Sequence, residues 1–130
     1  MNMQTLVFLC IENSCRSQIA QAFAKKYGEG KVNALSAGSH PSGQINEKAI
    51  LLMKEYDYDL NSHSSSGTND LPEGEVHSMI SMGCGDSCPT IKAKNRVEWN
   101  IPDPKNMELD EFREVIKEIE NRVLGLLETI

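Results

Sequence analysis

A cysteine and an arginine with five residues between them, Cys10 and Arg16, stand near the start of the chain in the segment CIENSCR. An apolar run at residues 4–9 precedes them, and a helical pattern follows, so the loop would join a buried strand to a helix N-terminus. Backbone N–H groups of such a loop can hold a tetrahedral oxyanion, which Arg16 would bind bidentately. The same positive field favours a thiolate at Cys10, the form that acts as a nucleophile. The spacing therefore predicts an oxyanion site with a cysteine nucleophile.

Other residues of the loop are expected to support this site. Ser14 is placed to hydrogen-bond the Cys10 sulfur, and Ser17 supports the loop from the first helical turn. Cys15 has two interpretations, a disulfide partner that protects Cys10 from over-oxidation or a buried spectator. The residues expected to bind the oxyanion are Ile11, Glu12, Asn13, Ser14, Cys15 and Arg16. The alternative is a small buried cysteine and a solvated arginine, but strand, loop and helix all agree with the site.

Two further cysteines, Cys84 and Cys88, lie in the segment CGDSCP, directly after an apolar run at residues 76–82. If the runs at residues 4–9 and 76–82 are neighbouring parallel strands, both cysteine loops meet at one edge of the sheet. Gly83 and Gly85 would give the second loop the freedom that an in-line thiolate attack needs. A turn can also bring cysteines at this spacing within the Cα separation of roughly 4.4 to 6.8 Å that a disulfide requires.

The pair Cys84 and Cys88 has two alternative interpretations. They could be unrelated cytosolic thiols, or they could form half of a zinc site together with Cys10 and Cys15. Tight zinc knuckles usually show CXXC spacing, which this sequence lacks, so the zinc interpretation is disfavoured and no metal is expected.

Asp103 lies in the segment NIPDP, where two prolines would hold one carboxylate rigidly. Such a carboxyl group is a candidate general acid for an oxygen that leaves the bound anion. An ordinary Asp-Pro turn is the alternative, and the local sequence does not decide between them.

Composition limits the classes of protein that the chain could belong to. It has 130 residues and a formal net charge of −6, which indicates one domain over residues 1–130. No run approaches the roughly 20 apolar residues that a membrane span needs, and no secretory signal is recognisable. Lysines and arginines do not gather on one face, so a nucleic-acid partner is not expected. Four cysteines without a signal peptide indicate reduced thiols in the cytoplasm.

Strand and helix patterns alternate along the chain. Residues 61–74 show no apolar period and are expected to form a long surface loop. Alternation of this kind predicts an α/β fold, a three-layer sandwich around a four-stranded parallel sheet. The expected strands are residues 4–9, 31–36, 76–82 and 96–100, and the expected helices are residues 14–27, 45–56 and 112–130.

Residues 10–17 (CIENSCRS) after a buried strand, with Asp103-Pro104 far downstream, resemble the low-molecular-weight tyrosine phosphatases and their relatives, the thioredoxin-coupled arsenate reductases. Residues 36–38, 46–63 and 99–104 are similar to the reductase branch, so the resemblance covers nearly the whole chain. The segment CGDSCP favours the same branch, because this type of reductase needs two cysteines beyond the nucleophile.

The resemblance implies a relay of three cysteines. Cys10 would attack arsenate and form a covalent adduct that loses water. Cys84 would then attack Cys10 and release arsenite, Cys88 would attack Cys84, and thioredoxin would reduce the outer disulfide. Arsenate, with phosphate or sulfate as mimics, and thioredoxin are thus the expected partners of a cytoplasmic monomer without a cofactor.

Two other functions stay open. A low-molecular-weight phosphatase would need only Cys10, Arg16 and Asp103 and would work through a Cys10 phosphoenzyme, hydrolysing phosphotyrosine or small aryl phosphates. Lys105 weakens the tyrosine phosphatase interpretation, because these phosphatases commonly carry an aromatic residue after Asp-Pro. A non-enzymatic regulator that binds an oxyanion or arsenite is the third possibility.

The chain also differs at several positions from the family that it resembles. Some reductases of this branch bind potassium through an Asn, a Glu, a Ser and an Asp. Asn13 and Ser36 match this set, but Gln21 and Ser66 replace the two carboxylates, so we expect no dependence on potassium. Glu12 stands where many relatives have glycine and puts a negative charge on the rim of the anion site.

Overall fold

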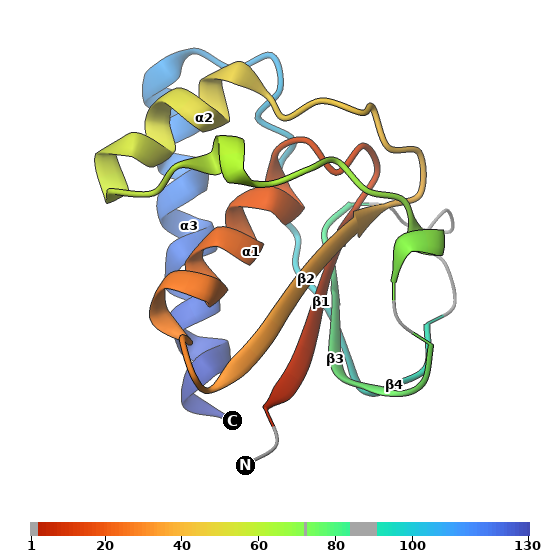
Figure 1. Cartoon of the computed structure of the whole chain (residues 1–130). Helices are drawn as coiled ribbons and strands as arrows, with labels where there is room; N and C mark the ends of the chain where they lie inside the picture. The colour runs from red at the N-terminus through yellow and green to blue at the C-terminus, as the bar shows by residue number, and fades with distance from the viewer. Residues whose placement is uncertain (1–2, 72, 84–90) are drawn as a thin grey trace.

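The computed structural model describes residues 3–71, 73–83 and 91–130. Its four strands form one sheet in the order β2-β1-β3-β4, and every neighbouring pair is parallel, as predicted. The strands are β1 Gln4–Cys10, β2 Val32–Gly38, β3 Val76–Ser81 and β4 Ala93–Glu98. Since β1 lies between β2 and β3, the carboxyl ends of these three strands lie side by side at one edge of the sheet (Figure 1).

Three α-helices accompany the sheet. They are α1 Arg16–Tyr27, α2 Glu47–Met53 and α3 Leu109–Glu128. In the described residues, three short 3-10 helices lie between α2 and β3, namely η1 Lys54–Tyr56, η2 Leu60–Ser62 and η3 Thr68–Asp70. No helix in the described part of the chain is long and apolar enough to cross a membrane.

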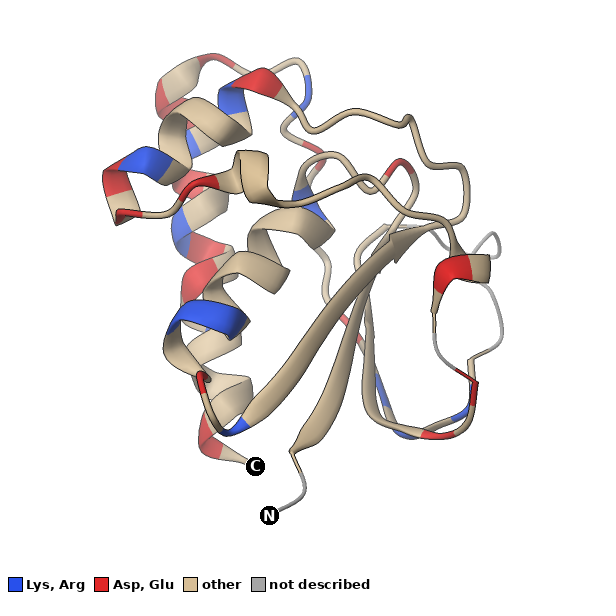
Figure 2. Ribbon diagram, viewed as in Figure 1, with Lys and Arg blue, Asp and Glu red and all other residues tan. Residues whose placement is uncertain are grey.

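The main core lies between the sheet and helices α1 and α3. Ile19 and Phe23 of α1 and Phe112 and Ile116 of α3 are fully buried, at the helical spacing that the sequence shows, against Phe8 of β1. Burial of such side chains, each worth about 1.5 to 3 kcal/mol, positions α1 directly after the loop that carries Cys10. The outer face of α3 carries lysines and arginines interspersed with acids (Figure 2).

The opposite face of the sheet has a second, smaller apolar cluster. Val7 and Leu9 of β1 and Met79 of β3 are buried there, and Leu71 and Ile91 pack against them. These covering residues come from loops, and η3 lies on the same side (Figure 1). The sandwich therefore has its three helices on one side and a thinner layer on the other.

The predicted element types are confirmed, but several boundaries differ. Strand β4 begins at Ala93 rather than residue 96, because it is an edge strand held by backbone pairing with β3 and has few buried side chains. Trp99 follows the strand and packs on Phe8, with ring centroids 6.0 Å apart. The loop predicted at residues 61–74 includes η3 and the end of η2, whose single turns leave no apolar period.

Candidate active site

The loop between β1 and α1 presents its carbonyl groups outward. Those of residues 10–15 accept hydrogen bonds, in order, from Ser39 N, His40 N, Ser42 N, Gln18 Nε2, Asn46 N and Ile19 N, at 2.8 to 3.3 Å. The described chain has no cis peptide, and a trans peptide points its N–H opposite to its C=O. The N–H groups of residues 11–16 therefore face away from these donors, as a cup for an anion requires.

A small cavity lies at this loop. Its volume is about 40 Å³, and it is lined by Cys10, Ile11, Glu12, Ser14, Cys15, Arg16, Asp103 and Lys105. The structure thus brings the predicted nucleophile, the predicted anion clamp and the predicted acid to one place, although Asp103 is far from the others in sequence.

The Cys10 sulfur is buried and lies 2.9 Å from Ser17 Oγ. Asn13 Nδ2 donates to the same Ser17 oxygen at 2.8 Å, so the Ser17 hydroxyl hydrogen is free to donate to the sulfur. The prediction that Ser14 makes this bond is wrong: Ser14 Oγ lies 3.7 Å from the Cys15 sulfur instead, because Cys10 and Ser17 face each other across the start of α1.

Asn13 is the centre of a buried network behind the cup. It has a left-handed backbone, with φ of 52°, a conformation that Asn tolerates better than most residues. Its Oδ1 accepts from Gln18 Nε2 at 2.8 Å and from Ser66 N at 2.7 Å. With the bond to Ser17, these contacts hold the loop in the shape that the anion cup needs.

The network continues to His63. Gln18 Nε2 is a donor, so its Oε1 accepts from His63 Nδ1 at 2.8 Å, and Tyr58 OH lies 2.6 Å from His63 Nε2. Burial lowers the pKa of His63 to about 4 and raises that of Tyr58. A neutral His63 therefore accepts from Tyr58 and donates to Gln18, which is a structural role. Sequence reasoning missed Gln18 and Tyr58, and only their contacts reveal their part in the site.

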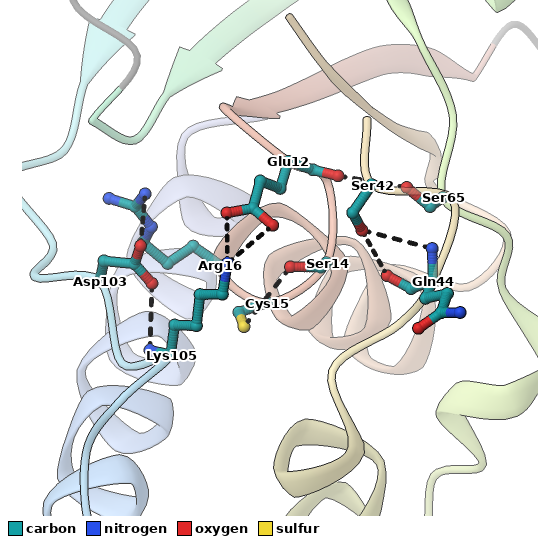
Figure 3. A network of polar contacts seen from close by, with 9 residues as sticks. All are labelled: Glu12, Ser14, Cys15, Arg16, Ser42, Gln44, Ser65, Asp103 and Lys105. Atoms are coloured by element: carbon teal, nitrogen blue, oxygen red, sulfur yellow. Dashed lines mark hydrogen bonds and ion pairs between the residues drawn. The ribbon is translucent and has the colours of Figure 1, made fainter. Parts of the chain in front are cut away.

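Arg16 lies almost buried below the mouth of the cavity. Its Nη1 donates to the Ile101 carbonyl at 3.1 Å, and its Nη2 is 3.8 Å from Asp103 Oδ2. The Asp103 side chain is 49% exposed, and its Oδ1 accepts from the Lys105 N–H at 3.1 Å (Figure 3). Asp103 thus stands beside the guanidinium at the solvent side of the site, where a proton donor for a leaving oxygen is needed.

Two glycines let neighbouring strands approach the site closely. A Cβ at Gly38 would lie 2.6 Å from the Ile11 carbonyl oxygen and 2.8 Å from Asn13 N. At Gly83, which has φ of +82°, a Cβ would overlap Nη1 of Arg16. The sequence indicated Gly83 only as a source of loop freedom, whereas its packing against Arg16 comes from the tertiary structure.

Of the four cysteines, Cys10 and Cys15 lie in the described part of the chain, and both are free and buried. Burial raises the pKa of Cys15 to about 12, so its thiol is neutral at physiological pH. This favours the spectator interpretation, because the thiolate is the reactive form. Cys84 and Cys88 lie outside the described residues.

A cavity of about 210 Å³ behind the loop is lined by Gln21, Ser36 and Ser66 among others. Gln21 Oε1 accepts from Ser36 Oγ at 2.5 Å, and Gln21 Nε2 donates to the Ala34 carbonyl at 3.1 Å. These are neutral groups that already bond to each other or to the backbone. Among the described residues, no three His, Cys, Asp or Glu side chains gather as a metal site.

A parallel four-stranded sheet with a CX5R loop between its first strand and first helix defines a class of phosphatase-like oxyanion-binding proteins. The family model for low molecular weight phosphotyrosine protein phosphatase matches residues 5–130, and the chain belongs to this family.

Several proteins that match this chain over nearly its full length are named arsenate reductases. The chain is 38% identical to "Arsenate reductase 1" of Bacillus cereus, over 98% of this chain and 97% of that protein. It is 32% identical to "Glutaredoxin arsenate reductase" of Synechocystis sp., over 98% and 99% of the two chains. A solved structure of an arsenate reductase in the phosphate binding state superposes with a TM-score of 0.90, at 31% identity, over 98% and 99% of the chains.

Proposed function

We propose that the protein reduces arsenate to arsenite and that Cys10 is the nucleophile. The observation that carries this proposal is the Cys10 sulfur, 2.9 Å from Ser17 Oγ in a cavity that Arg16 and Asp103 also line. Such a cup is suited to tetrahedral oxyanions in general. Arsenate is favoured because the full-length relatives at 38% and 32% identity are arsenate reductases.

In the first step the Cys10 thiolate attacks arsenic and an S–As bond forms. The N–H groups of residues 11–16 and the Arg16 guanidinium hold the remaining oxygens and their charge. One arsenate oxygen leaves as water, with a proton from Asp103. Arsenic is still pentavalent in this adduct.

The electrons come from thiols in the second step. Cys84 attacks the Cys10 sulfur, the S–As bond breaks, and its electron pair stays on arsenic, so that arsenite leaves and a Cys10–Cys84 disulfide remains. Strands β1 and β3 support this step, since Leu9 pairs with Ser81 and the chain after both residues reaches the same edge of the sheet. Cys88 then attacks Cys84 and restores the Cys10 thiolate.

A dithiol donor must reduce the Cys84–Cys88 disulfide, and we propose thioredoxin. An internal relay pair fits a protein donor that attacks an outward disulfide, and a reaction that consumes thiols fits the reducing cytoplasm. A glutaredoxin system is the competing donor, as the name of the Synechocystis relative indicates for that protein. The reaction needs only one chain, and we propose a monomer.

A phosphatase is the second candidate function, supported by the family as a whole and by the three residues Cys10, Arg16 and Asp103. It would form an S–P bond at Cys10 and hydrolyse it with water, without Cys84 or Cys88. Lys105 after Asp103-Pro104 is a poor partner for a phosphotyrosine ring, so arsenate reduction is the stronger candidate.

NADPH oxidation on addition of arsenate tests the proposal, with thioredoxin and thioredoxin reductase in one set and glutathione, glutaredoxin and glutathione reductase in another. Cys10→Ser, Cys84→Ser and Cys88→Ser are each expected to stop arsenate-dependent turnover. Only Cys10→Ser should stop hydrolysis of para-nitrophenyl phosphate. Ester cleavage without arsenate turnover in either set would show a phosphatase instead.

A further inference from the structure

An ion pair joins two distant loops at the mouth of the anion cavity. Lys105 Nζ lies 2.9 Å from Oε2 and 3.2 Å from Oε1 of Glu12, so it bonds both carboxylate oxygens. Glu12 belongs to the loop after β1, and Lys105 to the segment after Asp103-Pro104. Figure 3 shows the lysine side chain reaching to Glu12, with the Arg16–Asp103 pair beside it.

Without Lys105, the Glu12 carboxylate would oppose anion binding. Glu12 lines the same cavity as Cys10 and Arg16, so its carboxylate lies close to any anion bound there. The two negative charges would repel each other. Lys105 lines this cavity too, and its hydrogen bonds with Glu12 raise its pKa, so it stays protonated. Lys105 thus balances the negative charge of Glu12, which is a fixed part of the loop after β1.

The Glu12–Lys105 ion pair can open at a low cost in free energy. Its side chains are 48% exposed at Lys105 and 34% at Glu12, and such exposed pairs are weak. The backbone of Lys105 is restrained, because Pro104 precedes it and its N–H is bonded to Asp103, so Lys105 moves by its side chain alone. A freed Glu12 can turn toward an adjoining groove of about 400 Å³, which it also lines together with Glu47 and Lys48, whose Nζ donates to the Met107 carbonyl and has further N–H groups to donate.

We propose that Lys105 is an oxyanion-binding residue and that Glu12 is its internal competitor, which holds the lysine until a doubly charged tetrahedral anion displaces it. Arg16 is buried and its guanidinium is already engaged by the Ile101 carbonyl and Asp103, whereas the half-exposed Lys105 lines the same cavity and can supply a second cation to the anion. The inference rests on the oxyanion site of the proposed function, but not on any step of the cysteine relay.

Calorimetric titration of the reduced protein with inorganic phosphate tests this inference without any turnover. Four proteins are compared, the wild type, Lys105→Met, Glu12→Gln and the double variant. Lys94→Met and Glu75→Gln change charge by the same amounts at exposed positions at the opposite end of the sheet, and serve as matched controls.

If the inference is right, Lys105→Met weakens phosphate binding about 10-fold or more, because a charge-assisted bond is lost and Glu12 is left unpaired. Glu12→Gln tightens binding by about 2- to 5-fold, because Lys105 no longer has to leave an ion pair. The double variant binds more tightly than Lys105→Met alone, since no bare carboxylate remains. The controls bind as the wild type does.

Equal binding by Lys105→Met and Lys94→Met would overturn the role of Lys105. Unchanged or weaker binding by Glu12→Gln would overturn the competition. The arsenate turnover assay on the wild type fails or succeeds independently of these titrations, so a wrong reaction and a wrong anion ligand can be distinguished.

Discussion

The floor and the mouth of the anion cavity are held by different kinds of interaction. At the floor, Cys10, Asn13 and Ser17 are buried and joined by hydrogen bonds of 2.8 and 2.9 Å. At the mouth, Glu12 and Lys105 form an exposed ion pair. Buried networks are costly to break, whereas exposed pairs are weak and screened by salt. The floor is therefore held firmly around Cys10, the proposed nucleophile, whereas the pair at the mouth can open at low cost, as the proposed displacement by an anion requires.

The largest effect is expected from Asn13→Ala, which removes the centre of the floor. Ser17, Gln18 and the Ser66 N–H each lose a partner, and alanine disfavours the φ of 52°. We expect the free energy of unfolding to fall by about 2 to 4 kcal/mol and arsenate turnover to fall about 100-fold. Denaturant unfolding and steady-state kinetics measure both, with exposed Asn61→Ala as control. Wild-type turnover in Asn13→Ala would show that the floor does not need this network.

Gly83→Ala tests whether the close packing of Gly83 against Arg16 positions the guanidinium in the cavity. The added methyl group would overlap the guanidinium, and the φ of +82° also disfavours alanine. Binding of phosphate should weaken about 10-fold because Arg16 is displaced from its bidentate position. Gly30→Ala is the matched control, because its φ is +78° and no atom lies within 4 Å of the new methyl group. Equal phosphate affinity in the two variants would remove the proposed support.

The pH dependence of stability tests the contribution of His63, which bonds Gln18 behind the floor. Its pKa falls from 6.5 to about 4 on folding because of burial, so between these values the unfolded chain binds more protons. Stability from this group is present above pH 6.5 and is lost as the pH falls toward 4. Since His63 is only partly buried, the loss should be about 1 to 2 kcal/mol. Denaturant unfolding of the wild type and His63→Gln across this range measures it, and parallel pH profiles would contradict the prediction.

The smallest effect is expected from potassium. Gln21 Oε1 already accepts from Ser36, Ser66 offers no carboxylate, and Asp70, which lines the same cavity, already accepts from the Gly67 N–H at 3.0 Å. A hard cation therefore lacks a set of free charged ligands there. Turnover in potassium chloride should equal turnover in sodium chloride at the same ionic strength. A clear activation by potassium would show that neutral oxygens at this position suffice.

Local sequence was enough to predict the elements and the position of Cys10 and Arg16 in the loop between the first strand and the first helix. The continuous apolar run before Cys10 and the helical spacing of Phe112, Ile116 and Ile119 reflect burial, which acts on each element by itself. The first and last residues of β4 were predicted wrongly, because this outermost strand is defined by its pairing with β3 and not by its own side chains.

The site shows the same division. The Cys10–Arg16 spacing predicted a loop between a strand and a helix, and the structure places it between β1 and α1. The hydrogen bonds that hold this loop in shape come partly from residues 39–46 and 66, which only the tertiary fold brings close. Which hydroxyl faces the sulfur was decided by how α1 starts, which selects Ser17 over Ser14. The Glu12–Lys105 pair was decided by the tertiary fold alone, because no local pattern brings together two charges that are 93 residues apart.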